Sequence, residues 1–131
     1  MTYQFTSESV SEGHPDKVSD AISDAIATFI INGNIQNRAA VETLVTTDTV
    51  VVAGEYKTAK KPTSKQIEDI IRQTIKDIGY EQDGFHWETV KITNKLHGQS
   101  ADIALGTDDF GAGDQGLMFG YACMETPNYM P

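Results

Sequence analysis

A histidine and an aspartate, His14 and Asp16, flank a proline at the predicted start of a helix. The free N–H groups and the positive dipole end of a helix N-terminus favour phosphate binding. An imidazole there could stabilise negative charge on a leaving oxygen, and a carboxylate could hold Mg²⁺, which prefers oxygen ligands. The structural alternative is that the helix dipole stabilises the aspartate and that the histidine only caps the helix.

Two glutamates, Glu42 and Glu55, interrupt apolar, β-branched runs at residues 39–46 and 49–57. If these runs form a hairpin with an even-length loop, both carboxylates point to the same face of the sheet. Two close carboxylates repel each other unless a cation or a bound ammonium group lies between them. An odd loop would separate the two side chains, and a simply solvated face is the alternative.

A glycine-rich segment at 111–116, GAGDQG, satisfies the G-x-G-x-x-G pattern. A dinucleotide site requires a strand before this pattern, a helix after it and an acidic residue about 20 positions further on. Here a loop precedes the pattern and residues 117–122 read as a strand, so we reject that reading. The glycines instead predict close approach of the backbone to a ligand, with Asp114 as an acceptor. A plain hairpin loop is the alternative.

Two amphipathic helices are predicted to position these residues. One begins at Pro15 and stops at residues 32–33, and the other follows a capping box at 63–66 and is closed by Gly79. Strands are predicted at 39–46, 49–57, 89–96 and 117–124, with a further candidate at 3–7. This order indicates an α+β fold, a two-layer sandwich of a mixed or antiparallel sheet with helices on one face. The other face is left free for a partner.

The charge balance excludes several classes of function. The 131 residues include 10 Lys and Arg against 19 Asp and Glu, a net charge of −9. An acidic chain does not suit nucleic acid or an anionic membrane surface. Neither a membrane-spanning run nor a signal-peptide pattern is present, which predicts a cytoplasmic protein. Cys123 is the sole cysteine, so we expect no intrachain disulfide and no catalytic role for it.

Three segments together resemble one enzyme family. They are FTSESVSEGHPDK at 5–17, GQS at 98–100 and GAGDQGLMFGY at 111–121. In this order they are similar to the N-terminal third of methionine adenosyltransferase, also called S-adenosylmethionine synthetase. The resemblance implies an N-terminal domain at residues 1–100, then a gating loop and the first strand of a central domain at 101–131.

The resemblance also implies a reaction, in which methionine sulfur attacks C5′ of ATP and the expelled triphosphate is hydrolysed to pyrophosphate and phosphate. It implies a homodimer or a dimer of dimers in which sheet faces pack together, with active sites between subunits. The roles carried over by resemblance are catalysis and ATP binding for His14, Mg²⁺ for Asp16, K⁺ for Glu42, methionine for Glu55 and Gln99, and methionine or adenosine for Asp114.

The chain also departs from the family pattern. Ala101 stands where the family usually has proline, and the gating loop at 100–110 looks shortened. The family's second glycine signature and its later triphosphate-binding lysines and arginine are absent from the 131 residues. We therefore expect an incomplete chain that is inactive alone. Two alternatives are a non-catalytic regulatory or binding module and one half of a split enzyme.

Overall fold

The computed structural model divides the chain into two units, Val10–Ser100 and a second unit formed by Met1–Ser9 and Ala101–Pro131. It describes residues 4, 6, 8, 10–32, 34–99, 116–117 and 120–130. The elements in chain order are α1 (Pro15–Ile31), β1 (Arg38–Thr46), β2 (Thr49–Lys57), α2 (Ser64–Ile78), β3 (Glu81–Gln82), β4 (Phe85–His86) and β5 (Lys91–Gly98).

Both helices begin and end where the sequence predicts. Pro15 is the first residue of α1, and Asn32 caps its C-terminus. Thr63 and Gln66 form the reciprocal hydrogen bonds of a capping box at the start of α2. Gly79 ends α2 with φ of 99°, in the left-handed region that glycine adopts without steric cost. Local side-chain chemistry thus determines the length of each helix.

The main sheet has the order β1-β2-β5. β1 and β2 form an antiparallel hairpin closed by residues 47 and 48, whereas β2 and β5 are parallel and joined through α2. β5 begins two residues later than predicted, because the N–H groups of Thr89 and Val90 both donate to the carbonyl of His86 in a turn. The sheet is therefore mixed.

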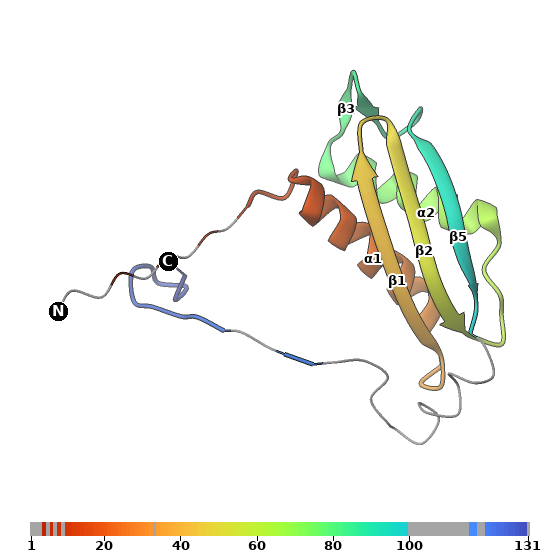
Figure 1. The fold of residues 1–131 in the computed structure, drawn as a ribbon, viewed down its shortest axis with the longest axis horizontal. Helices are drawn as coiled ribbons and strands as arrows, with labels where there is room; N and C mark the ends of the chain where they lie inside the picture. Colours follow the sequence, from red (N-terminus) through yellow and green to blue (C-terminus); the bar gives the residue numbers. More distant parts are fainter. Residues whose placement is uncertain are drawn as a thin grey trace. The chain divides into compact units, whose positions relative to one another are not determined.

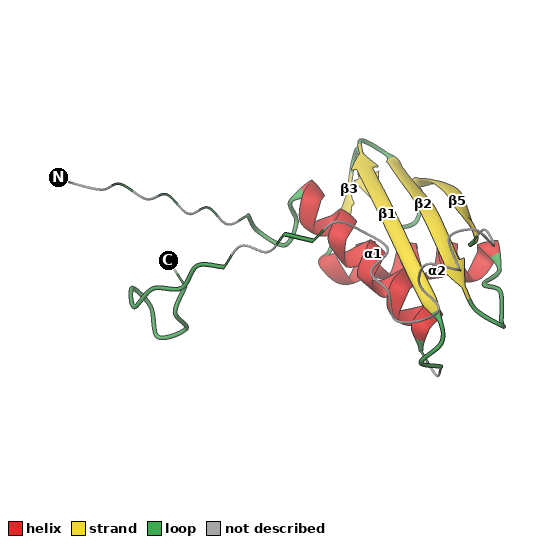
Figure 2. Ribbon diagram, turned by 60° about the horizontal axis from the view of Figure 1, so that its bottom comes forward, coloured by secondary structure: helices red, strands yellow, loops and turns green. Residues whose placement is uncertain are grey.

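Helices α1 and α2 cover one face of this sheet and leave the other face open (Figures 1 and 2). The buried core lies between the two layers, which confirms the predicted α+β sandwich. The buried residues are Val18, Ile22, Ile26, Ile30, Val50, Val52, Ile67, Ile71, Ile75, Phe85 and Val90.

A small hairpin, β3–β4, was not predicted. It turns at Gly84, whose φ is 86°, and Asp83-Gly84 is a common hairpin signal that the sequence already carried. The segment that follows is held by Arg72. Its guanidinium donates to the carbonyls of Trp87, Glu88 and Val90 at 2.8, 2.8 and 3.3 Å.

Two predicted strands are not strands at the residues the structure describes. Of the candidate at 3–7, only Gln4 and Thr6 are described, and of 117–124 only Leu117 and residues 120–124. A strand needs a hydrogen-bonded neighbour. The backbone near 117–124 instead closes a turn, in which the N–H of Cys123 donates to the carbonyl of Tyr129 at 3.1 Å. At its described residues this segment pairs with no described strand.

Within the described part of the chain, neither helix combines the length and the apolar character that crossing a bilayer requires.

Candidate functional site

His14 is the N-cap of α1. Its ring Nδ1 accepts a hydrogen bond from the backbone N–H of Asp16 at 3.1 Å. The backbone N–H of His14 donates to the carbonyl of Ser11 at 2.9 Å. Because Nδ1 is an acceptor, the neutral ring carries its proton on Nε2. The side chain is 40% exposed, so this Nε2–H is accessible to a ligand. The capping alternative and the functional reading are therefore compatible, since they use different ring nitrogens.

Asp16 lies in the first turn of α1 with its side chain 88% exposed. Its carboxylate is 3.8 Å from His14 Nδ1, a weaker contact than the backbone hydrogen bond to the same nitrogen. A pocket of about 500 Å³ lies beside this helix end, lined by Pro15, Tyr80, Phe85 and the hairpin turn at 46–47. The start of α1 thus presents an imidazole and an exposed carboxylate beside this pocket.

Glu42 and Glu55 share the open face of the sheet. The loop between β1 and β2 has two residues, and Glu55 lies opposite Ala40, two positions from Glu42. Side chains two positions apart on a strand point to the same side, so the predicted shared face is confirmed. Such diagonal neighbours are roughly 7–8 Å apart between Cα atoms, a separation that long side chains can bridge around a small cation.

Glu55 has a partner that the sequence did not predict. Its Oε1 lies 3.4 Å from Nε2 of His97, the residue directly opposite it on β5. The Glu55 side chain is only 29% exposed, and that of His97 is 64% exposed. The outward alternation of β5 could have revealed His97, but only once the pairing of β2 with β5 was known.

Gln99 extends from the end of β5 beside the same corner of the sheet. Its N–H donates to the carbonyl of Tyr56 at 2.8 Å, which fixes its backbone next to β2. Its Oε1 is buried and has no hydrogen-bond partner among the described residues. A donor from a ligand could satisfy this acceptor, because a buried acceptor left unpaired costs about 1–3 kcal/mol. Gln99 and Glu55 together offer acceptors for an ammonium or amide group.

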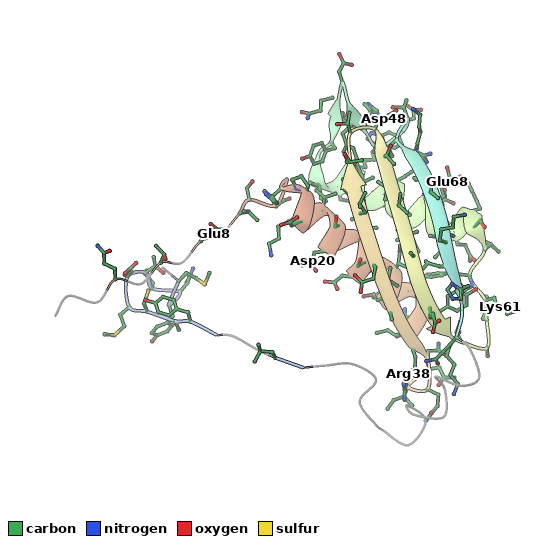
Figure 3. The ribbon with its side chains drawn as sticks, viewed as in Figure 1. Glu8, Asp20, Arg38, Asp48, Lys61 and Glu68 are labelled. Carbon is green, nitrogen blue, oxygen red and sulfur yellow. The ribbon has the colours of Figure 1, made fainter. Side chains whose placement is uncertain are left out.

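The structure does not bring these two groups of residues together. Pro15 lines the same pocket as Thr46 and Thr47, whereas Glu55 pairs with Ala40 near the opposite end of β1. The length of strand from residue 40 to residue 46 is roughly 20 Å, at about 3.3 Å per residue. Figure 3 marks these two ends of the hairpin with Asp48 and Arg38. The groups also lie on opposite faces, since α1 covers the face away from the glutamates (Figure 2).

The described residues contain no group of three or more His, Cys, Asp or Glu side chains placed to hold a metal ion. Mg²⁺, however, commonly takes one or two protein carboxylates together with substrate phosphates and water. The exposed Asp16 fits that pattern, and Glu42 offers a second isolated carboxylate. The remaining expected site residue, Asp114, lies outside the described residues.

The chain matches one protein family along most of its length. The family described as S-adenosylmethionine synthetase, N-terminal domain, matches residues 2–101, and its central domain matches residues 109–131. The chain belongs to the S-adenosylmethionine synthetase family.

Similarity to individual members of this family extends over nearly the whole chain. The S-adenosylmethionine synthase of Rhodospirillum centenum is 58% identical over 98% of this chain and 34% of its own length. That of Erythrobacter litoralis is 56% identical over 99% of this chain and 36% of its own length. A solved S-adenosylmethionine synthetase from Campylobacter jejuni aligns with a TM-score of 0.73 at 34% identity, covering 92% of this chain and 31% of that one. The chain thus spans about a third of the length of these S-adenosylmethionine synthetases.

Proposed function

We propose that this chain supplies the N-terminal part of an enzyme that makes S-adenosylmethionine from ATP and L-methionine. The observation that carries the proposal is the 54–58% identity, over 98–99% of the chain, to proteins named S-adenosylmethionine synthase. In this reaction a bond forms between methionine sulfur and C5′ of ATP while the C5′–oxygen bond breaks. Triphosphate leaves and is hydrolysed to pyrophosphate and phosphate. The thioether is already nucleophilic, so the enzyme needs charge stabilisation and alignment more than a base.

The start of α1 acts on the triphosphate end in this proposal. The Nε2–H of His14 donates to the oxygen that leaves C5′, while Nδ1 remains occupied by the N–H of Asp16. The carboxylate of Asp16 binds Mg²⁺, which neutralises phosphate charge when it is bound. Its high exposure leaves room for phosphate and water ligands. The helix dipole has the sign that favours an anion at this end.

In this proposal, residues on the open face of the sheet bind methionine and K⁺. Glu55 receives the methionine ammonium in exchange for His97, and the unsatisfied Oε1 of Gln99 accepts a hydrogen bond from the same amino acid. Glu42 binds K⁺ at its diagonal position on that face. Asp114 contacts methionine or adenosine, as the family resemblance implies.

Two copies are needed to join these groups, and we propose a cytoplasmic homodimer or dimer of dimers. One chain separates His14 from Glu55 by about the length of a strand and by the thickness of the sheet. Leu44, 58% exposed, adds an apolar side chain to the open face. Packing two open faces would bring the glutamates of one copy toward the α1 end of another. In this arrangement residues 1–100 form the N-terminal domain, and 101–131 form the gating loop and the beginning of the central domain.

A chimeric enzyme tests the proposal. The first third of the Rhodospirillum centenum synthase is replaced by these 131 residues, and S-adenosylmethionine formation is measured with ATP, methionine, Mg²⁺ and K⁺. We expect turnover by the chimera and none by the 131-residue chain alone. The unaltered synthase is the control for the assay, and its oligomeric state is the reference for correct assembly.

A chimera that assembles like the control yet makes no product would contradict the proposal and favour a non-catalytic module. Turnover by the 131-residue chain alone would contradict the need for further residues. Loss of activity on omitting either Mg²⁺ or K⁺, with variants Asp16→Asn and Glu42→Gln requiring more of the respective ion, would assign the two metals.

A further inference from the structure

Tyr80 connects the two helices at the end of the domain where α1 begins. It follows Gly79, the residue that ends α2, and its hydroxyl donates a hydrogen bond to the carbonyl of Gly13. These residues are 67 positions apart in sequence. A methyl group at Gly13 would meet Tyr80 Oη at 3.5 Å, so the phenol lies directly against this residue. The residue before the His14 cap is thus bound to the end of the other helix.

Tyr80 itself is firmly held. Its N–H donates to the carbonyl of Ile75 at 3.2 Å, and its carbonyl accepts from the N–H of Trp87 at 3.1 Å. Its ring meets Phe85 edge-to-face, with centroids 5.0 Å apart and an interplanar angle of 82°. Phe85 is in turn buried in the core. The hydroxyl therefore projects from a rigid base toward Gly13.

We infer that Tyr80 is a positioning residue for His14 and Asp16. The Gly13 carbonyl belongs to the peptide group that leads into His14, so holding this oxygen fixes the orientation of that peptide. The His14 backbone then keeps the extended conformation, φ −64° and ψ 141°, that brings Nδ1 to the N–H of Asp16. With Nδ1 occupied, the ring directs Nε2–H outward. The inference rests on the function proposed above for His14 and Asp16.

A substitution can separate the contribution of the Tyr80 hydroxyl from that of the aromatic ring. Tyr80→Phe keeps the ring against Phe85 and removes only the donor to Gly13. Tyr56→Phe is the matched control, because Tyr56 also packs against the core but lies on β2 near the opposite end of the hairpin. Both variants retain the apolar volume of the ring, so a difference between them reports the hydroxyl of Tyr80.

The test is NMR spectroscopy of the 131-residue chain without substrate. In Tyr80→Phe we expect amide exchange of His14 and Val18 to accelerate about tenfold, the effect of losing one hydrogen bond. The ring ¹⁵N shifts of His14 should move from those of a fixed Nε2–H tautomer toward those of free histidine. The amide exchange rate of Ile71, in the core, should not change. In Tyr56→Phe, the amide exchange rate and ring ¹⁵N shifts of His14 should equal those of the unaltered chain.

Unchanged His14 exchange and unchanged ring shifts in Tyr80→Phe would overturn the inference. Faster exchange at Ile71 to the same degree would also overturn it, because the hydroxyl would then stabilise the whole domain.

Kinetics of the chimera separate this inference from the proposed function. There Tyr80→Phe should lower kcat about tenfold and leave KM for methionine unchanged, since the methionine groups lie at the other end of the sheet. A lower kcat with these features supports the inference, and a raised KM with unchanged kcat contradicts it. If His14→Asn keeps full activity, the proposed role of His14 fails, whereas the NMR result still decides whether Tyr80 positions it.

Discussion

His14 caps α1 through Nδ1, whereas its proposed catalytic role uses Nε2–H, and substitutions can separate the two roles. His14→Ala removes both Nδ1, which caps α1, and the Nε2–H proposed to act on the leaving triphosphate. His14→Asn keeps a short side-chain acceptor, one of the best N-caps, and removes only the imidazole. The pair is therefore a matched test of the two roles.

The two substitutions should differ in their effect on unfolding free energy and agree in their effect on kcat. Losing a side-chain N-cap costs about 1 kcal/mol of unfolding free energy. For a folded unit of the size of Val10–Ser100 this lowers Tm by about 4–8 °C. His14→Asn should stay within about 0.5 kcal/mol of the unaltered chain. In the chimera both variants should lose about 10²–10³ in kcat, the usual effect of removing a donor to a developing anion.

Two measurements decide the matter. Thermal and urea unfolding of the 131-residue chain give the free energies, and S-adenosylmethionine formation by the chimera gives kcat. If His14→Asn destabilises the chain as much as His14→Ala, Nδ1 is not a significant cap. If His14→Asn retains the kcat of the unaltered chimera, the imidazole does not stabilise the leaving group, and the proposed mechanism is refuted.

Three further predictions concern residues that hold the fold or complete the site. Arg72→Lys should lower the unfolding free energy by about 2 kcal/mol, because lysine cannot reproduce the forked guanidinium that reaches three carbonyls. As the control, Lys65→Gln, at an exposed ion pair, should leave the urea midpoint of unfolding unchanged. Gly54→Ala should cost more than about 3 kcal/mol, since φ is 127° and the new Cβ would collide with the Ala40 carbonyl. Gly79→Ala, where the space is open and only φ opposes it, should cost about 1 kcal/mol by the same unfolding measurement. Gln99→Leu should leave the chain at least as stable, because no described residue donates to Oε1, yet it should raise KM for methionine in the chimera. A clear loss of stability, or an unchanged KM, would contradict this.

Local sequence signals were reliable where a few neighbouring residues decide the outcome. The capping box at 63–66 and Gly79 bound α2 as predicted, because each motif satisfies its own helix end without help from distant residues. The position of Glu42 and Glu55 on one face of the sheet also follows from the even, two-residue length of the hairpin loop alone. The candidate strand at 117–124 depends instead on a distant partner, since an apolar run becomes a strand only when another strand pairs with it.

By itself the sequence determined the family, the two helices, the hairpin and the residues that could do chemistry, because residue type and short-range spacing carry that information. Only the tertiary structure decided which of these residues meet. It paired His97 with Glu55 across parallel strands and joined Tyr80 to Gly13 across 67 positions. It also left Gln99 Oε1 without a donor among the described residues. It also separated His14 from Glu55 by roughly 20 Å of strand. Contacts of this kind arise from packing two layers around one core, and no local pattern in the chain encodes them.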